Sequence, residues 1–173
     1  MPRRPLLALL CLLSLSLHAA QAPADTPPRP LLEQVQRLSE LLRDSYAVWY
    51  PEATQVRLLQ AEGGEELALV VFTVEGFAGG NNHTQYLAAF AADADPQGQA
   101  HFSLIDVLPV AGKGWRAITE FAPRVSRDAG HNELSIAIDA LEVTAGDSPN
   151  FPSQKTTVHL ALKDGRLVER RSP

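Results

Sequence analysis

The sequence contains almost no sulfur. Its 173 residues include one cysteine and one methionine, and both lie within the first eleven positions, as Cys11 and Met1. A single cysteine cannot form an intrachain disulfide. No thiolate remains further along the chain to bind zinc, hold an iron–sulfur cluster or act as a nucleophile. The sequence therefore excludes a disulfide scaffold and cysteine chemistry in the folded part of the chain.

Positive charge is also scarce. The chain has 15 Lys and Arg against 20 Asp and Glu, a formal charge of −5 at pH 7, and no basic cluster longer than Arg170-Arg171. An acidic chain without a basic cluster is not typical of nucleic-acid binding. After residue 24 no apolar run approaches the roughly 20 residues that span a bilayer. We therefore expect no nucleic-acid partner and no membrane insertion of the mature protein.

Residues 1–24 have the pattern of a secretory signal peptide. Arg3 and Arg4 precede an apolar run over residues 6–17, and alanines follow at positions 19, 20, 22 and 24. The run is too short for a transmembrane helix but fits the apolar region of a signal peptide. Cleavage is expected between positions 19 and 24. The pattern predicts a soluble exported protein, and the excess of Arg over Lys favours a bacterial periplasm over other secretory routes.

One helix is predicted after the signal. Residues 25–30 form a proline-rich leader, and residues 31–173 are expected to form a single globular domain. Apolar residues recur at helical spacing over residues 31–46, which predicts an amphipathic helix. The expected buried stripe comprises Leu31, Val35, Leu38, Leu42, Ser45 and Trp49, widened by Leu32, Leu41 and Tyr46.

The rest of the chain favours strands. Short apolar stretches alternate with turns rich in Gly, Asn, Asp and Pro, and no second helical pattern follows. The sequence therefore predicts an α+β fold, with one N-terminal amphipathic helix packed on a curved antiparallel meander of seven or eight strands. A small closed β-barrel with the helix across one mouth is the alternative. The expected strands cover residues 55–61, 67–74, 84–92, 102–110, 115–121, 133–143, 156–162 and 167–170.

Two turns carry candidate ligand-binding residues. Gly79, Gly80, Asn81 and Asn82 all tolerate positive φ, so their backbone N–H groups could form a concave anion site. Trp115 and Arg116 follow a Gly-Lys-Gly turn, and Trp and Arg are enriched at binding hot spots. A simple hairpin loop and an inward-packed Trp115 are the structural alternatives for these two turns.

Metal and catalytic sites are not predicted. If residues 84–92 and 102–110 pair, His101 should face Ala91 and His83 should face Pro109. The two histidines would then lie at opposite ends of a hairpin, too far apart to share a metal. Residues 93–98 resemble part of a calcium loop but fit a tight turn better, because Leu104 stands where the bidentate Glu would be. Asp106 and Asp139 lie within apolar strands and are expected to point to solvent or to an edge.

The sequence contains no nucleophile elbow, zinc-protease motif or phosphate-binding loop. It therefore favours a non-enzymatic exported protein that binds an unknown protein or small ligand and needs no cofactor. A carrier of an apolar or amphiphilic ligand in the concavity of the sheet is the second hypothesis. A hydrolase that uses two carboxylates is the third, and it requires acidic or His side chains that converge in one pocket.

Overall fold

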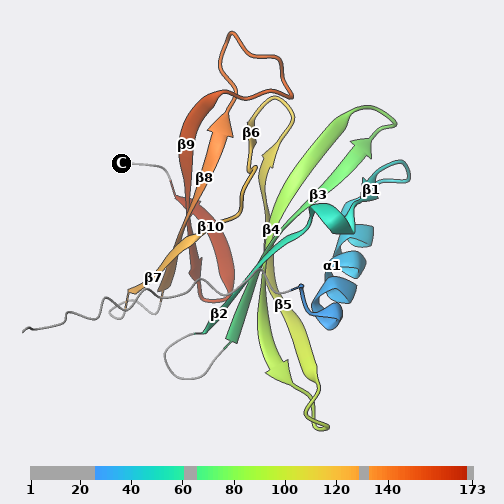
Figure 1. Ribbon diagram of the computed structural model, residues 1–173, viewed down its shortest axis with the longest axis vertical. Helices are drawn as coiled ribbons and strands as arrows, with labels where there is room; N and C mark the ends of the chain where they lie inside the picture. Colours follow the sequence, from blue (N-terminus) through green and yellow to red (C-terminus); the bar gives the residue numbers. More distant parts are fainter. Residues whose placement is uncertain (1–25, 61–65, 129–132, 171–173) are drawn as a thin grey trace, which may run out of the picture.

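The computed structural model describes residues 26–60, 66–128 and 133–170 (Figure 1). The predicted signal peptide, residues 1–24, lies outside the described residues. The described part has one α-helix, a short 3-10 helix and ten strands. These elements are α1 (Arg29–Leu42), β1 (Val48–Trp49), η1 (Pro51–Ala53), β2 (Gln55–Gln60), β3 (Glu66–Phe77), β4 (Asn82–Ala94), β5 (Ala100–Gly112), β6 (Arg116–Ala117), β7 (Arg124–Asp128), β8 (Glu133–Glu142), β9 (Gln154–Lys163) and β10 (Arg166–Arg170).

The strands form one antiparallel sheet in the order β1-β3-β4-β5-β6-β8-β9-β10. Strand β2 pairs with β3 beside β1, and β7 pairs with β8 beside β6. From β2 to β6 and from β7 to β10 each strand pairs with the next, so the predicted antiparallel meander with one helix is confirmed. In the described residues the sheet does not close, and the alternative of a closed barrel is wrong. The edges of β5 and β10 meet through the side chain of Asp106 instead of a backbone ladder.

The predicted number of seven or eight strands is too low, because β1 and β7 were not expected. Strand β1 has only two residues, which pair with Val74 and Glu75 of β3 and show no alternation that a sequence pattern could reveal. Strand β7 contains a single apolar residue, Val125. Both strands lie next to longer strands that supply most of the pairing, so their own composition does not need to favour a strand.

Helix α1 begins and ends earlier than expected. It starts at Arg29, inside the stretch predicted as a leader, and Arg43 already has an extended backbone. The carboxylate of Asp44 accepts hydrogen bonds from the N–H groups of Tyr46 and Ala47, which stabilises a turn in place of another helical turn. Tyr46 and Trp49 therefore lie outside the helix. Leu41 is 83% exposed, so the predicted buried stripe was too wide.

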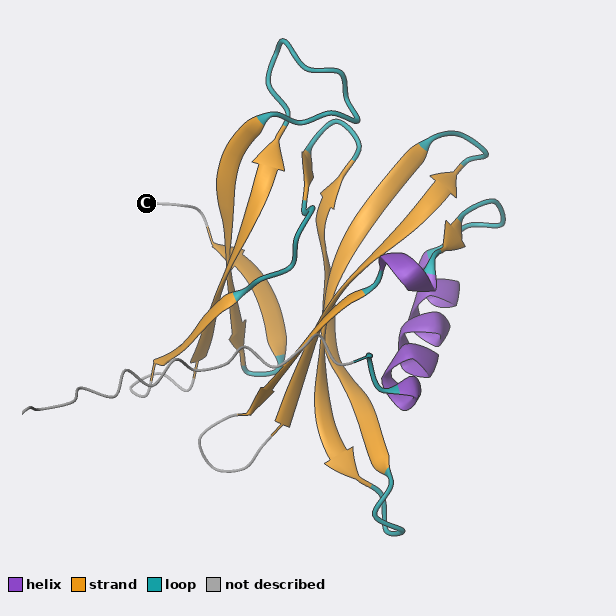
Figure 2. Cartoon of the chain, in the orientation of Figure 1, coloured by secondary structure: helices purple, strands orange, loops and turns teal. Residues whose placement is uncertain are grey.

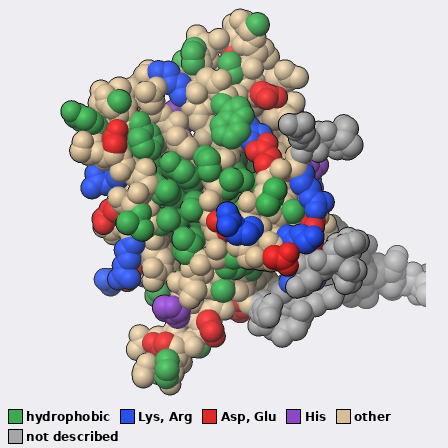
Figure 3. All heavy atoms as spheres, turned by 180° about the vertical axis from the view of Figure 1, so that it is seen from behind, with side chains coloured by type: hydrophobic (Ala, Val, Ile, Leu, Met, Phe, Trp, Pro, Cys, Tyr) green, Lys and Arg blue, Asp and Glu red, His purple; other side chains and the backbone are tan. Residues whose placement is uncertain are grey.

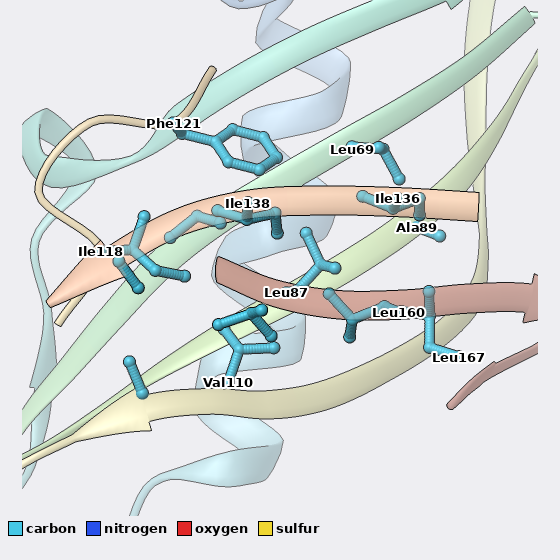
Figure 4. Close-up of a cluster of buried hydrophobic side chains, with 14 residues drawn as sticks. Leu69, Leu87, Ala89, Val110, Ile118, Phe121, Ile136, Ile138, Leu160 and Leu167 are labelled. Carbon is cyan, nitrogen blue, oxygen red and sulfur yellow. The ribbon is translucent and has the colours of Figure 1, made fainter. Parts of the chain in front are cut away.

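Strands β3 and β4 are buried on both faces. One face shares a cluster with Leu31, Val35 and Leu38 of α1, and the helix lies along this face in Figures 1 and 2. The other face packs against β8, β9 and β10, and Figure 4 shows the side chains of this second cluster. Val70 belongs to the first cluster and its neighbour Val71 to the second. The apolar run at residues 67–74 is explained by this double burial.

Strand β6 is much shorter than the predicted stretch of residues 115–121. The side-chain amide of Gln85 accepts from the N–H of Ile118 at 2.7 Å and donates to its carbonyl at 3.0 Å. Gln55 accepts from the N–H of Phe121 at 2.7 Å. These amides replace a strand ladder, and the chain can turn Ile118 and Phe121 into the core (Figure 4).

The β4–β5 hairpin has a different register from the one expected. His101 faces Asp93 and not Ala91, because the turn is centred on Gln97 instead of Pro96. Two β-bulges shift the pairing again further from the turn, so Pro109 faces Tyr86 and not His83. The two histidines still lie at opposite ends of the β4–β5 hairpin. Residues 95–99 form a turn in which the Asp95 carboxylate accepts from the N–H groups of Gln97 and Gln99. These hydrogen bonds within the segment fit the tight turn that the sequence predicts for residues 93–98.

Two searches of the described ranges add to this description. Residues 26–60, 66–128 and 133–170 contain no group of three or more His, Cys, Asp or Glu side chains placed to hold a metal ion. In the same ranges, α1 and η1 are both too short to cross a membrane.

Candidate functional site

Four loops meet at one end of the molecule, at the top of Figure 1. We call this surface the loop end and define it by residues 43–47, 78–82, 113–116 and 144–153. Hydrogen bonds join each loop to the next: Ala78 donates to Asp44, Lys113 to Asn81 and Gly114 to Pro149. The loop end therefore contains both turns that the sequence singled out, at residues 79–82 and 115–116.

Asp44 connects the first two loops. Its Oδ1 accepts from the N–H groups of Tyr46 and Ala47, and its Oδ2 accepts from the N–H of Ala78 at 2.8 Å. The N–H of Ala78, followed by those of Ala47 and Tyr46, holds the pKa of the Asp44 carboxyl below its usual value. The carboxylate is therefore the form that fixes both loops.

The turn at Gly79 packs against the ring of Tyr46. Gly79 has a φ of +70°, and a Cβ there would lie 3.6 Å from Cδ1 of Tyr46. Glycine adopts this positive φ readily, whereas a residue with a side chain would be strained there. The N–H groups of Gly79 and Gly80 donate to the carbonyls of Gly76 and Phe77. Since these groups already have acceptors, the geometry assigns the turn to loop packing and leaves little support for the predicted anion site.

The turn at Lys113 lies between the loop of residues 78–82 and the loop of residues 144–153. The Lys113 ammonium donates to Oδ1 of Asn81, and the N–H of Gly114 donates to the carbonyl of Pro149 at 2.8 Å. Gly112 approaches the backbone so closely that a Cβ there would lie 2.8 Å from the carbonyl oxygen of His83. This close approach brings the β5–β6 turn beside the start of β4.

Trp115 and Arg116 have different environments. The Trp115 side chain is 39% exposed, whereas Arg116 is buried. The Arg116 guanidinium lies over the Trp115 ring, 4.0 Å from its centroid, and donates to the carbonyl of Val110 and to the carboxylate of Glu169. Arg116 therefore covers part of one face of the Trp115 ring, and Trp115 remains partly exposed to solvent.

Asp147 organises the longest of the four loops. Its Oδ2 accepts from the N–H of Thr144 at 2.7 Å and from both the N–H and the hydroxyl of Ser153. The Thr144 N–H is the main reason that the pKa of the Asp147 carboxyl is lowered. Phe151 lies between these anchor points, and its own N–H donates to the carbonyl of Ser148. Hydrogen bonds on both sides of Phe151 therefore fix the loop that carries this exposed side chain.

Exposed aromatic side chains are the main chemical feature of the loop end. Tyr46 is 67% exposed, Phe151 is 75% exposed and Trp115 is 39% exposed. Trp115 was a candidate from the sequence, but Tyr46 and Phe151 were missed. Tyr46 had been placed on the helix. An aromatic residue at position 151, between Pro149 and Pro152 in a loop, was a signal that could have been used.

Three loops from distant parts of the chain thus hold aromatic rings toward solvent, and the carboxylates nearby are occupied by backbone N–H groups. This arrangement suits contact with a partner better than chemistry on a substrate. Comparison of the chain with protein-family models, with curated proteins and with solved structures finds no match.

Proposed function

We propose that the protein is an exported, non-enzymatic interaction protein whose contact surface is the loop end. The observation that carries this proposal is the set of three exposed aromatic residues, Tyr46, Trp115 and Phe151, on loops fixed by hydrogen bonds. Export is inferred from the signal-like pattern of residues 1–24. The partner class that fits such a surface is another protein.

Aromatic residues on rigid loops are suited to binding proteins. Tyr and Trp provide a large contact area but have few rotatable bonds, so ordering them on binding costs little conformational entropy. Asp44 and Asp147 further reduce this cost because they hold the loops before a partner arrives. Hydrophobic side chains also gather in the middle of the face opposite to the view of Figure 1 (Figure 3). Exposed apolar area of this kind is typical of proteins with binding partners.

The packing of α1 disfavours the hypothesis of an apolar-ligand carrier. That hypothesis places a cavity between the helix and the sheet. Leu31, Val35, Phe72 and Phe90 lie there in one cluster, each with at most 1% of its surface exposed. A ligand at this position would have to displace α1 and expose these side chains.

The two carboxylates within apolar strands also have structural partners. Asp106 binds Arg166 and the N–H of Leu167, whereas Asp139 binds Arg124 through two hydrogen bonds of 2.8 Å. Each carboxylate thus belongs to its own ion pair, and neither is left free to act as a general acid or base. These contacts favour an interaction protein over a carboxylate hydrolase.

Site-specific photo-crosslinking tests the proposed contact surface. A photoreactive phenylalanine analogue replaces Phe151 in one sample and Leu58 in the control, since Leu58 is also an exposed apolar residue but lies on β2. We expect a discrete protein adduct from position 151 in cells that produce and export the protein. Replacing Tyr46 and Trp115 with Ser in the same chain should reduce that adduct at least fivefold.

Two results would contradict the proposal. Equal adducts from positions 151 and 58 would mean that contacts are non-specific, and an adduct that survives the double substitution would remove the aromatic residues from the interface. Cell fractionation and determination of the mature N-terminus test export separately. Cleavage between positions 19 and 24 is expected, and an uncleaved protein in the cytoplasm would overturn that part.

A further inference from the structure

A second candidate site lies outside the loop end, on strands β7 to β10, and uses different chemistry. A pocket of about 310 Å³ opens over strands β7, β8, β9 and β10. Ile136 and Leu160 point into the core (Figure 4), so their neighbours Ser135, Ala137 and His159 face the opposite, outer side of the sheet. The pocket is therefore on the outer face. Its lining residues are Arg124, Val125, Ser126, Ser135, Ile136, Ala137, His159, Leu160 and Arg170.

The register places three basic lining residues and Ala137 in one row across the four strands. Arg124 pairs with Ala137, Ala137 with His159, and His159 with Arg170. At about 4.8 Å between neighbouring strands, the Cα atoms of Arg124 and His159 lie roughly 10 Å apart. Ala137 is the only small side chain of the row, and its methyl group leaves space between the longer side chains. Ser126 and Ser135 form the next pair along the same strands.

Arg124 is held in place and still has donors to offer. Its Nη1 and Nη2 each donate to one oxygen of Asp139 at 2.8 Å, and Thr157 donates to the same carboxylate at 3.2 Å. A guanidinium has five N–H donors, and this bidentate pair uses two. The other three, including Nε, have no acceptor among the described residues and can bind a second anion. Asp139 therefore orients the Arg124 guanidinium but binds only two of its five N–H donors.

Arg170 forms the opposite wall in a similar way. It belongs to β10, and its Nη2 binds the buried carboxylate of Glu133 on β8, on the far side of β9. Among the described residues this Nη2 contact uses one of the five N–H donors of the guanidinium. The pocket thus has an oriented arginine on each side, with His159 and two serine hydroxyls between them.

The C-terminal part of the chain, which forms this pocket, carries less net negative charge than the part before it. Residues 25–123 contain six Lys and Arg against thirteen Asp and Glu, whereas residues 124–173 contain seven of each. None of the residues that line the pocket is acidic. We propose that this pocket binds a small molecule through an oxyanion, either a carboxylate or a phosphate group. Its volume is at the lower end of the range for small-molecule sites, which suits a compact anion.

The proposed recognition uses donors on three sides. The free N–H groups of Arg124 and Arg170 bind anion oxygens from opposite walls, and the hydroxyls of Ser126 and Ser135 add neutral hydrogen bonds. The space above Ala137 accommodates the body of the ligand. This binding site is independent of the proposed protein-contact surface, because none of its lining residues belongs to the loop end.

NMR titration tests the proposal with two probes, inorganic phosphate and acetate, each added to the ¹⁵N-labelled protein at constant ionic strength. We expect saturable shifts of amide signals from residues 124–126, 135–137 and 159–160, with millimolar affinity. The probe that binds more tightly identifies the favoured oxyanion. Ala137→Leu should weaken binding at least tenfold, because it fills the pocket without changing any charge.

Matched controls separate this effect from general destabilisation. Ala94→Leu makes the same change at an exposed position of β4, and Arg57→Gln removes an exposed charge on β2. Both should leave the affinity unchanged, whereas Arg124→Gln should lower it at least fivefold. Shifts that grow linearly, shifts centred on other residues, or full affinity in folded Ala137→Leu would each overturn the proposal. If Ala137→Leu does not fold, unchanged affinity in Arg124→Gln overturns it.

Discussion

The carboxylate of Asp106 on β5 accepts a hydrogen bond of 2.8 Å from the backbone N–H of Leu167 on β10, sixty-one positions further along the chain. The same oxygen accepts from Nε of Arg166 at 3.2 Å. At this point the part of β5 that β6 leaves unpaired is joined to the edge strand β10 by a side chain. Asp106 thus performs the role that a backbone carbonyl would have in a closed barrel.

Removal of this carboxylate should destabilise the protein. Asp106→Ala leaves the N–H of Leu167 without its acceptor, and a hydrogen bond to a charged group is worth about 1.5–3 kcal/mol. We expect a loss of that size in the free energy of unfolding, measured by urea denaturation. Most of it should come from Leu167, because the Arg166 side chain is largely exposed and such ion pairs contribute little. Glu120→Ala, at an exposed position, is the control, and equal effects of the two substitutions would contradict this role.

Leucine-to-alanine substitutions should distinguish the buried face of α1 from its exposed face by their effect on stability. Leu31→Ala removes a side chain that is fully buried against the sheet and should cost about 2–5 kcal/mol. Leu41→Ala, on the same helix, removes a largely exposed side chain and should change stability by less than about 0.5 kcal/mol. Chemical denaturation measures both. Similar midpoints for the two variants would show that α1 does not contribute to the folded core.

The stability of the folded protein should change with pH in the acid range because Asp44 is protonated there. Its pKa in the folded protein lies below the ordinary value of 3.8, chiefly because the N–H of Ala78 donates to the carboxylate. A lowered folded-state pKa contributes stability that is present above the unfolded-state pKa and is lost as the pH falls through the folded-state pKa. Asp44→Asn should therefore lower the thermal midpoint at pH 7, and the difference from the unmodified protein should shrink below about pH 4. A difference that is constant from pH 7 to pH 3 would argue against this linkage.

Gly112 should not tolerate a side chain. A Cβ at this position would lie 2.8 Å from the carbonyl oxygen of His83, and a backbone atom cannot move aside easily. Overpacking of this kind costs about 1–3 kcal/mol, so Gly112→Ala should lower the urea midpoint. Gly146→Ala is the matched control, since its Cβ would meet only the Thr144 hydroxyl at 4.0 Å. We expect the control to remain within about 0.5 kcal/mol of the unmodified protein.

Local patterns predicted the positions of most elements. Each of the eight expected stretches contains a strand, because apolar alternation or continuous apolar runs reflect burial against the core. The end of the helix was missed because Leu41, Tyr46 and Trp49 continue its apolar spacing. The structure places Asp44 in a turn that interrupts the helix after Leu42. A side chain that caps a turn competes with the helix, and apolar periodicity does not record this competition.

The candidate site depended on contacts that local patterns cannot reveal. The sequence identified the turns at residues 79–82 and 115–116 separately. Only the fold brings Asn81 to Lys113 and Gly114 to Pro149. The basic row in the outer pocket is equally hidden, because Arg124, His159 and Arg170 belong to three strands and become neighbours through register. Register depends on bulges and on the whole hydrophobic pattern of the sheet.

The burial of β3 and β4 between two layers has a consequence for local opening of the molecule. The side chains of Val70 and Ala88 face α1, while those of Val71 and Leu87 face β8 and β9, yet all four residues belong to the same two paired strands. Detaching the helix would expose one set of side chains and leave the other covered. Hydrogen exchange should therefore be slowest in the middle of β3 and β4, where exchange requires global unfolding, and faster in α1 and β10, which can open separately.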